Sequence, residues 1–206
     1  MAKKKNKISG SAYIILLQDH FEILRRAYES YLVLESFSGL LSDVHREDAE
    51  YPRVRFFTDL ILATVSAAFD SYVINLHKFY DSRSHCLEHL VDVGVEHEAI
   101  PPWLETIVRK KIKKAAACAA NKHIQLLRNR NVGHYRITNQ EHSPLTTIDP
   151  RPEEVRDYFA RIGEILKLCA DHAPLSNSPL RYNQFERQIT ATAGMAIRYF
   201  RGEKAP

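Results

Sequence analysis

Residues 53–80, RVRFFTDLILATVSAAFDSYVINLHKFY, carry the strongest helical signal in the chain. The apolar side chains recur at helical spacing and fall on nearly every side of the helix: Phe56, Phe57, Leu60, Ile61, Leu62, Val65, Phe69, Tyr72, Val73, Leu76 and Phe79. A helix that is apolar all round is buried inside a protein or a membrane. The stretch therefore predicts one long helix as the most buried element of an all-α protein.

The segments around it also have the spacing of helices. Apolar residues recur at steps of three or four over residues 11–45, and Pro52 disfavours helix in the residue before it. Helices are also predicted at about 84–93, 102–132, 152–172 and 180–201. Ser84 is the expected N-cap of the first of these, and Gly133 the expected stop of the second. The fold class is all-α: an antiparallel helical bundle of five or six helices.

Length and composition fit a single folded domain. The chain has 206 residues, of which 45% are hydrophobic and 26% charged. Residues 1–10, rich in lysine, are expected to form a basic disordered tail. Residues 11–173 are expected to form the bundle, and residues 174–206 a C-terminal helix that packs on it.

Composition also narrows the function classes. No apolar run reaches the ~18 residues of a membrane span, and no secretory signal segment follows the basic N-terminus. Three cysteines without CxxC spacing are expected to be reduced and mostly buried thiols of a cytoplasmic protein. The sequence predicts neither a metal site nor a cofactor. A net charge of +4 is compatible with nucleic-acid binding.

Residues 126–135, LLRNRNVGHY, hold the most informative motif. Arg128 is followed by the polar Asn129 and, after five intervening residues, by His134. This arrangement resembles the signature of the HEPN superfamily, in which an Arg is followed by a polar residue and is separated from a His by four to six intervening residues. The resemblance covers residues 11–173 and implies a helical bundle whose motif lies late in a long helix. The predicted helix over residues 53–80 ends in Phe79-Tyr80-Asp81, and this ending resembles that of the abortive-infection (AbiU-like) branch of the superfamily.

The resemblance implies a metal-independent endoribonuclease of a toxin–antitoxin or phage-defence system, which cleaves RNA to a 2′,3′-cyclic phosphate. Arg128 and His134 would be catalytic, with Asn129, Arg130 and Tyr135 in support. Histidine exchanges protons near neutral pH, and a planar guanidinium holds two phosphate oxygens at once. The superfamily's sites form across a homodimer, and its toxins often pair with a nucleotidyltransferase antitoxin, so the resemblance implies both partners.

The helical register leaves two arginines in competition. On a straight helix Arg128 and His134 point about 240° apart, whereas Arg130 and His134 share a face. Either Gly133 ends the helix and lets His134 turn back, or the site is shared between two subunits. We expect Arg128 to be the functional arginine because Asn129 follows it.

Other residues allow two interpretations each. Arg109, Lys110, Lys111, Lys113 and Lys114 form either an RNA-binding phosphate track or an ordinary solvated helix face. Asp81 either contacts the motif or faces solvent. The small residues of 115–120 are expected to allow a close helix crossing. Two further function classes remain: a catalytically silent HEPN-like bundle that binds RNA or protein, and an unrelated helical adaptor.

Overall fold

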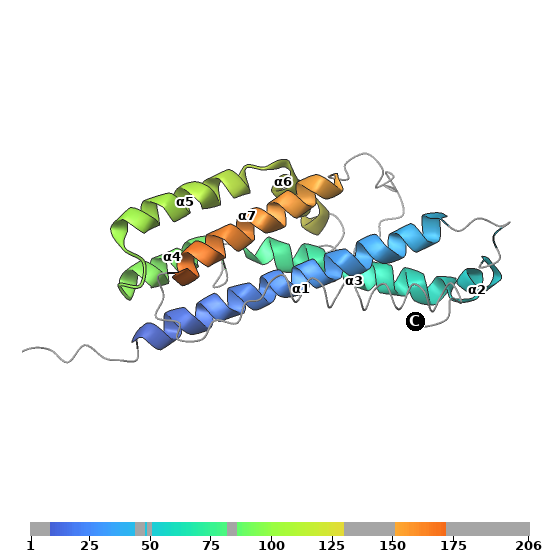
Figure 1. Ribbon diagram of the computed structural model, residues 1–206, viewed down its shortest axis with the longest axis horizontal. Coiled ribbons are helices and arrows are strands. Elements are labelled where there is room, and N and C mark those ends of the chain that lie inside the picture. Colours follow the sequence, from blue (N-terminus) through green and yellow to red (C-terminus); the bar gives the residue numbers. More distant parts are fainter. Residues whose placement is uncertain (1–8, 44–47, 49–50, 82–85, 130–150, 172–206) are drawn as a thin grey trace, which may run out of the picture. The chain divides into compact units, whose positions relative to one another are not determined.

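The computed structural model describes residues 9–43, 48, 51–81, 86–129 and 151–171 (Figure 1). Within these residues the chain forms seven helices and no strand. They are α1 (Ser9–Asp43), α2 (Tyr51–Phe56), α3 (Thr58–Lys78), α4 (Leu87–Glu96), α5 (Pro102–Ala116), α6 (Ala119–Leu127) and α7 (Pro152–Asp171). The prediction of an all-α helical bundle is confirmed. The predicted C-terminal helix and most of the predicted basic tail lie outside the described residues.

The chain divides into two compact units. The described part of the first unit is residues 9–25, 73–81, 86–129 and 151–171, and that of the second is residues 26–43, 48 and 51–72. Helices α1 and α3 each contribute to both units, whereas α4 to α7 belong to the first.

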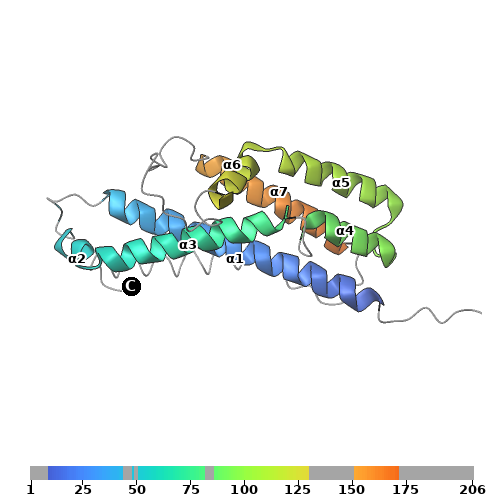
Figure 2. The ribbon, with the colours of Figure 1, turned by 180° about the vertical axis from the view of Figure 1, so that it is seen from behind.

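The core of the first unit forms around α7. This helix packs against α5 and α6, and α4 packs against α5. Figures 1 and 2 show α5 and α7 side by side and running in opposite directions. One face of α7 is buried along its whole length: Val155, Tyr158, Phe159, Ile162, Ile165, Leu166 and Cys169. Each large apolar side chain buried in this way contributes about 1.5–3 kcal/mol.

The predicted helix over residues 102–132 is broken in its alanine-rich part. Helix α5 ends at Ala116, α6 begins at Ala119, and Cys118 between them is extended at φ −70° and ψ 157°. The buried Asn121 side chain stabilises the break, because its Nδ2 donates to the carbonyl of Ala116 at 2.8 Å. This bond satisfies a carbonyl that a helix end leaves without a partner. The small residues therefore accompany a corner in the chain.

The predicted helix over residues 53–80 is also divided. Pro52 lies inside α2, where the first turn of a helix tolerates proline, and Phe57 forms a turn between α2 and α3. The Phe57 N–H and the Thr58 hydroxyl both donate to the Val54 carbonyl at 3.1 Å. At the Val54 carbonyl, a backbone hydrogen bond that spans three residues and a hydrogen bond from a side-chain hydroxyl thus replace the backbone bond over four residues of an α-helix.

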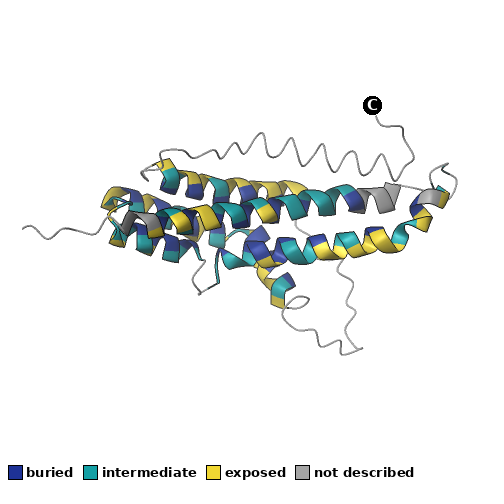
Figure 3. Ribbon diagram, turned by 90° about the horizontal axis from the view of Figure 1, so that it is seen from below, coloured by how far each residue is buried: buried dark blue, intermediate teal, exposed yellow. Residues whose placement is uncertain are grey.

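The expectation that this stretch is the most buried element is wrong for its first half. Phe37, Val54 and Ile61 form the core cluster of the second unit. Phe56, Leu60 and Leu62, however, are 80%, 55% and 50% exposed, and exposed residues recur along the start of α3 (Figure 3). A helix that is apolar all round has more apolar faces than this unit covers.

Helix α3 is also the one helix of the described residues that is long and apolar enough to cross a membrane, and 33% of its most apolar stretch is buried. A core helix of a soluble protein meets the same criterion.

Helix α4 begins later than predicted. Its N-cap is Cys86, whose Sγ accepts a hydrogen bond from the His89 backbone N–H at 3.3 Å, so the prediction of Ser84 as N-cap is wrong. Gly94 lies inside the helix, and its carbonyl accepts from the backbone N–H groups of Ala99 and Ile100 at 2.8 and 3.0 Å. The turn that leaves α4 therefore closes on Gly94.

Candidate functional site

Arg128 and Asn129, the first two residues of the motif, are in contact at the end of α6. Arg128 keeps helical backbone angles (φ −57°, ψ −46°), and its Nη1 donates to Oδ1 of Asn129 at 3.2 Å. Arg128 is half-buried and Asn129 is exposed. The Asn129 amide thus holds the guanidinium at the surface.

The rest of the motif lies outside the described residues. Arg130, His134 and Tyr135 belong to this part of the chain. The pairing of Arg128 with His134, and the choice between Arg128 and Arg130, therefore stay predictions.

The position of Arg128 depends on how α6 is fixed to α7. Ile124 and Leu127 of α6 are buried, and α6 packs against α7. At the start of α6 the Tyr158 hydroxyl donates to Oδ1 of Asn121 at 2.9 Å. Arg128 follows Asn121 by two helical turns, so this bond sets the direction in which α6 carries the arginine.

The C-terminal end of α3 lies beside α6, as Figures 1 and 2 both show. Here the backbone N–H groups of Tyr80 and Asp81 donate to the His77 carbonyl at 3.0 and 3.1 Å. The Tyr80 ring stacks against the Tyr158 ring, with 6.3 Å between centroids. Tyr158 therefore contacts both the end of α3 and the start of α6.

His77, in this turn, interacts electrostatically with the motif arginine. Burial and the Arg128 guanidinium both lower the pKa of His77, while the Asp81 carboxylate opposes them. Asp81 thus acts on a neighbouring histidine, and its two interpretations stay predictions. His77 was not among the predicted site residues, although its spacing of four from Asp81 was a usable signal.

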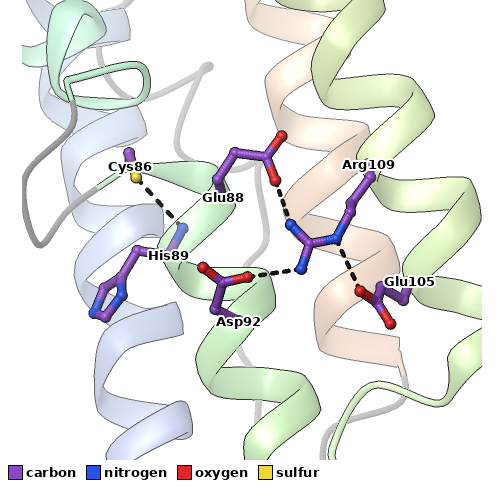
Figure 4. Close-up of polar contacts among 6 residues, drawn as sticks. All are labelled: Cys86, Glu88, His89, Asp92, Glu105 and Arg109. Atoms are coloured by element: carbon purple, nitrogen blue, oxygen red, sulfur yellow. Dashed lines mark hydrogen bonds and ion pairs between the residues drawn. The ribbon is translucent and has the colours of Figure 1, made fainter.

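Two of the five basic residues on α5 are held by carboxylates. The Arg109 guanidinium donates to Glu88, Asp92 and Glu105 at 2.5, 2.6 and 2.9 Å (Figure 4). These bonds, the one to Asp92 first, raise the pKa of Arg109 above its ordinary value. They join α4 to α5.

Lys111 makes a similar link to α7. Its Nζ donates to Oε1 of Glu164 at 2.7 Å. In this structure Arg109 and Lys111 therefore connect helices.

The other three basic residues lie on the outer face of α5. Lys110, Lys113 and Lys114 are exposed, and their spacing of three and four places them on one side of the helix. Trp103 and Ile107 precede Lys110 by seven and three residues and are 57% and 42% exposed. Helical register thus brings an aromatic ring to the lysine face, although no aromatic residue interrupts the basic run itself.

The described residues contain three free cysteines and no group of His, Cys, Asp and Glu side chains that could hold a metal ion. Only one of the three thiols is fully buried, so the expectation of mostly buried cysteines is wrong. Burial raises the pKa of this thiol, Cys169, to about 12, which removes thiolate character at neutral pH.

Comparison with known proteins adds no assignment. No family model, no curated protein and no solved structure matches this chain. The candidate site consists of the Arg128–Asn129 contact, the end of α3 and the lysine face of α5, as the contacts above describe them.

Proposed function

We propose that this chain is a member of the HEPN superfamily and a metal-independent endoribonuclease of a toxin–antitoxin or phage-defence system, acting in the cytoplasm. The observation that supports this most is the hydrogen bond from Arg128 to Asn129 at the surface end of α6. An arginine that must grip a phosphate needs a fixed orientation and access to solvent, and Arg128 has both.

The proposed chemistry divides between two residues. The Arg128 guanidinium binds two non-bridging oxygens of the scissile phosphate and stabilises the negative charge that grows on them in the transition state. His134 exchanges a proton with the ribose 2′-oxygen or with the leaving 5′-oxygen. Together they would yield a 2′,3′-cyclic phosphate and a free 5′-hydroxyl.

The exposed lysines supply a binding surface for the substrate. Lys110, Lys113 and Lys114 point away from the core of the first unit and would contact successive phosphates. This face also supports the second candidate function, a silent bundle that binds RNA, because phosphate binding by α5 does not require Arg128.

We further propose that the active form is a homodimer. Phe56, Leu60 and Leu62 expose large apolar side chains in the second unit, and such a surface is typical of a protein interface. A nucleotidyltransferase antitoxin is proposed as the partner that restrains the nuclease.

Cleavage of total RNA in the presence of EDTA tests the proposal. The wild type should cleave in chelator, His134→Ala should be inactive, and Arg128→Lys should lose about 10²-fold because a point charge replaces a two-pronged contact. Lys122→Arg, at an exposed position of the same helix, serves as the control and should keep the wild-type rate. RNA binding without cleavage by the wild type would favour the silent bundle, and neither binding nor cleavage would contradict both functions.

A further inference from the structure

The exposed side of α3 in the second unit carries side chains whose size changes along the helix. Leu60 and Leu62, near the start of α3, are 55% and 50% exposed. Ala63, Ser66 and Ala67, in the next two turns, are exposed as well, and all three side chains are small. These exposed residues recur along the helix in Figure 3. One end of this α3 face therefore projects large apolar side chains, and the other end leaves space above it.

Three residues of the α3 face form one line along the helix. Leu60, Ala63 and Ala67 follow one another by three and four residues, which places them within about 60° on one side. Ile61 and Ala68 are buried on the opposite side. The second unit thus packs on one side of α3 and leaves an apolar line uncovered on the other.

A second copy of the same face would complement it if the two helices ran in opposite directions. A two-fold axis that passes between residues 63 and 64 would place Leu60 of each copy opposite Ala67 of the other. Large side chains would then fill the space above small ones, as close packing between helices requires. A parallel pair would set leucine against leucine at one end and alanine against alanine at the other.

Two charged residues near the ends of this face favour the same arrangement. Asp70 follows Ala63 by seven residues, so it lies on the same side of α3, and Arg55 is exposed at the end of α2. Neither forms a salt bridge with another of the residues that the structure describes. With Leu60 opposite Ala67, Asp70 lies opposite residue 57 of the other copy, within reach of the long side chain of Arg55. The two-fold axis forms this ion pair twice.

A membrane suits the same face less well. By length and composition α3 could cross one, and lipid would also cover its leucines. However, Asp59 is exposed and Asp70 is half-buried on this side of the helix, and carboxylates are costly in hydrocarbon. A second copy instead offers Asp70 a guanidinium.

We propose that the α3 face is the interface of the homodimer and that it packs antiparallel on the α3 face of a second copy. Leu60 contacts Ala67, and Arg55 pairs with Asp70, each across the two-fold axis. This inference rests on the homodimer of the proposed function and names the surface that forms it. It does not depend on RNA cleavage.

Charge reversal tests the ion pair. Arg55→Glu and Asp70→Arg each bring like charges together at both ends of the interface, so each should raise the dissociation constant of the homodimer by about 10–10²-fold at low salt. An equimolar mixture of the two variants should form a heterodimer, because the introduced carboxylate meets the introduced guanidinium and the native pair forms at the other end. Native mass spectrometry identifies this species. Arg26→Glu, at an exposed arginine of α1 in the same unit, should dimerise like the wild type.

An exchange of side-chain size tests the apolar contact without any change of charge. Leu60→Ala should raise the dissociation constant about 10²-fold, because each of two symmetric contacts loses about tenfold. Ala67→Leu crowds the same contacts and should also weaken the dimer. The double variant Leu60→Ala/Ala67→Leu restores one large and one small side chain at each contact, so its affinity should return to near the wild-type value. Sedimentation equilibrium measures the affinities, and thermal unfolding shows that each variant folds.

The outcomes separate this interface from the proposed function. A wild-type dimer that folded Leu60→Ala and Arg55→Glu both retain at unchanged affinity would overturn the interface and leave the homodimer in place. Weakening by the single variants without recovery in the mixture or the double variant would overturn the antiparallel arrangement. A monomeric wild type that binds phosphatidylcholine vesicles would show that lipid covers this face, and one that binds neither would overturn the homodimer as well. The nuclease is decided independently, by RNA cleavage in EDTA.

Discussion

The hydroxyl of Tyr158 donates to Oδ1 of Asn121 at 2.9 Å, and both side chains are buried. Nδ2 of the same amide binds the Ala116 carbonyl, so Asn121 links the end of α5, the start of α6 and the middle of α7. The corner between α5 and α6, and with it the position of Arg128, depends on one amide.

Asn121→Ala should therefore lower the free energy of unfolding by about 1–3 kcal/mol, because it removes two buried hydrogen bonds, one from the Tyr158 hydroxyl and one to the Ala116 carbonyl. Chemical denaturation measures the loss, and Lys122→Ala, an exposed neighbour, is the control. A double-mutant cycle with Tyr158→Phe should give a coupling energy of about 0.5–3 kcal/mol. Additive effects would show that the two side chains act independently.

Gly94 and Gly163 form a matched pair of helical glycines with opposite surroundings. A Cβ at Gly94 would lie 2.6 Å from Cδ1 of Ile100 and 2.8 Å from Cε2 of Tyr13, whereas a Cβ at Gly163 would meet Leu24 at 3.8 Å. Gly94→Ala should destabilise the protein by about 1–3 kcal/mol, and Gly163→Ala should stabilise it by about 0.5–1 kcal/mol. Equal effects in thermal unfolding would contradict the close packing at Gly94.

Arg109 and Lys110 are neighbours in sequence that should behave differently. Arg109→Gln should lower stability by about 1 kcal/mol, since its ion pairs are partly exposed, and leave the salt dependence of RNA binding unchanged. Lys110→Gln should leave the melting temperature unchanged and reduce the slope of log K against log salt by about 0.7. Binding of a labelled single-stranded RNA at several salt concentrations gives this slope. If only Arg109→Gln reduced the slope, Arg109 and not Lys110 would be the residue that binds RNA phosphates.

The exposed apolar residues of the second unit offer a test of the homodimer. Leu60→Glu places a charge on that surface, and a dimer formed there should dissociate because the charge would be buried without a partner. Ile15→Glu, at a residue of similar exposure in the first unit, should leave the dimer intact. Sedimentation equilibrium at micromolar concentration measures both, and a monomeric wild type would rule out the dimer.

Lowering the pH should reduce the free energy of unfolding of the wild type by more than that of His77→Gln. The folded-state pKa of His77 is lowered, so below about pH 6.5 the unfolded state binds more protons than the folded state. Stability contributed by neutral His77 is therefore complete above that pH and is lost as the pH falls towards the folded-state pKa. Urea unfolding at several pH values between about 5 and 8 should show the difference, and Arg128→Gln should reduce it. If acidification instead stabilised the wild type relative to His77→Gln, the lowered pKa of His77 in the folded state would be contradicted.

Helical periodicity predicted the fold class and the bounds of α1 and α7 well. The predicted helices over 11–45 and 152–172 correspond to Ser9–Asp43 and Pro152–Asp171. The corner at Cys118 escaped notice because alanine favours helix and the break depends on Asn121 and Tyr158, which are distant in sequence from each other. The division at Phe57 was missed for a similar reason, since it depends on which donor reaches the Val54 carbonyl.

The candidate site was predictable only in part. Arg128 and Asn129 stand out by their order in the chain, and the structure brings their side chains into contact. His77 could not be linked to them from sequence, because α3 and α6 are separated by about forty residues and meet only through packing. Likewise, the sequence of the basic run does not indicate which of its side chains form ion pairs with the carboxylates of α4 and α7.

The cluster around Arg109 also has a consequence for how an RNA strand would lie. Three carboxylates and one guanidinium sum to −3 + 1 = −2, and the Asp92 side chain is 61% exposed. A polyanion drawn to the lysines next to it is repelled on the α4 side of α5. The strand would therefore be favoured along α5 towards α6, so that its path leads to Arg128 before any base is read.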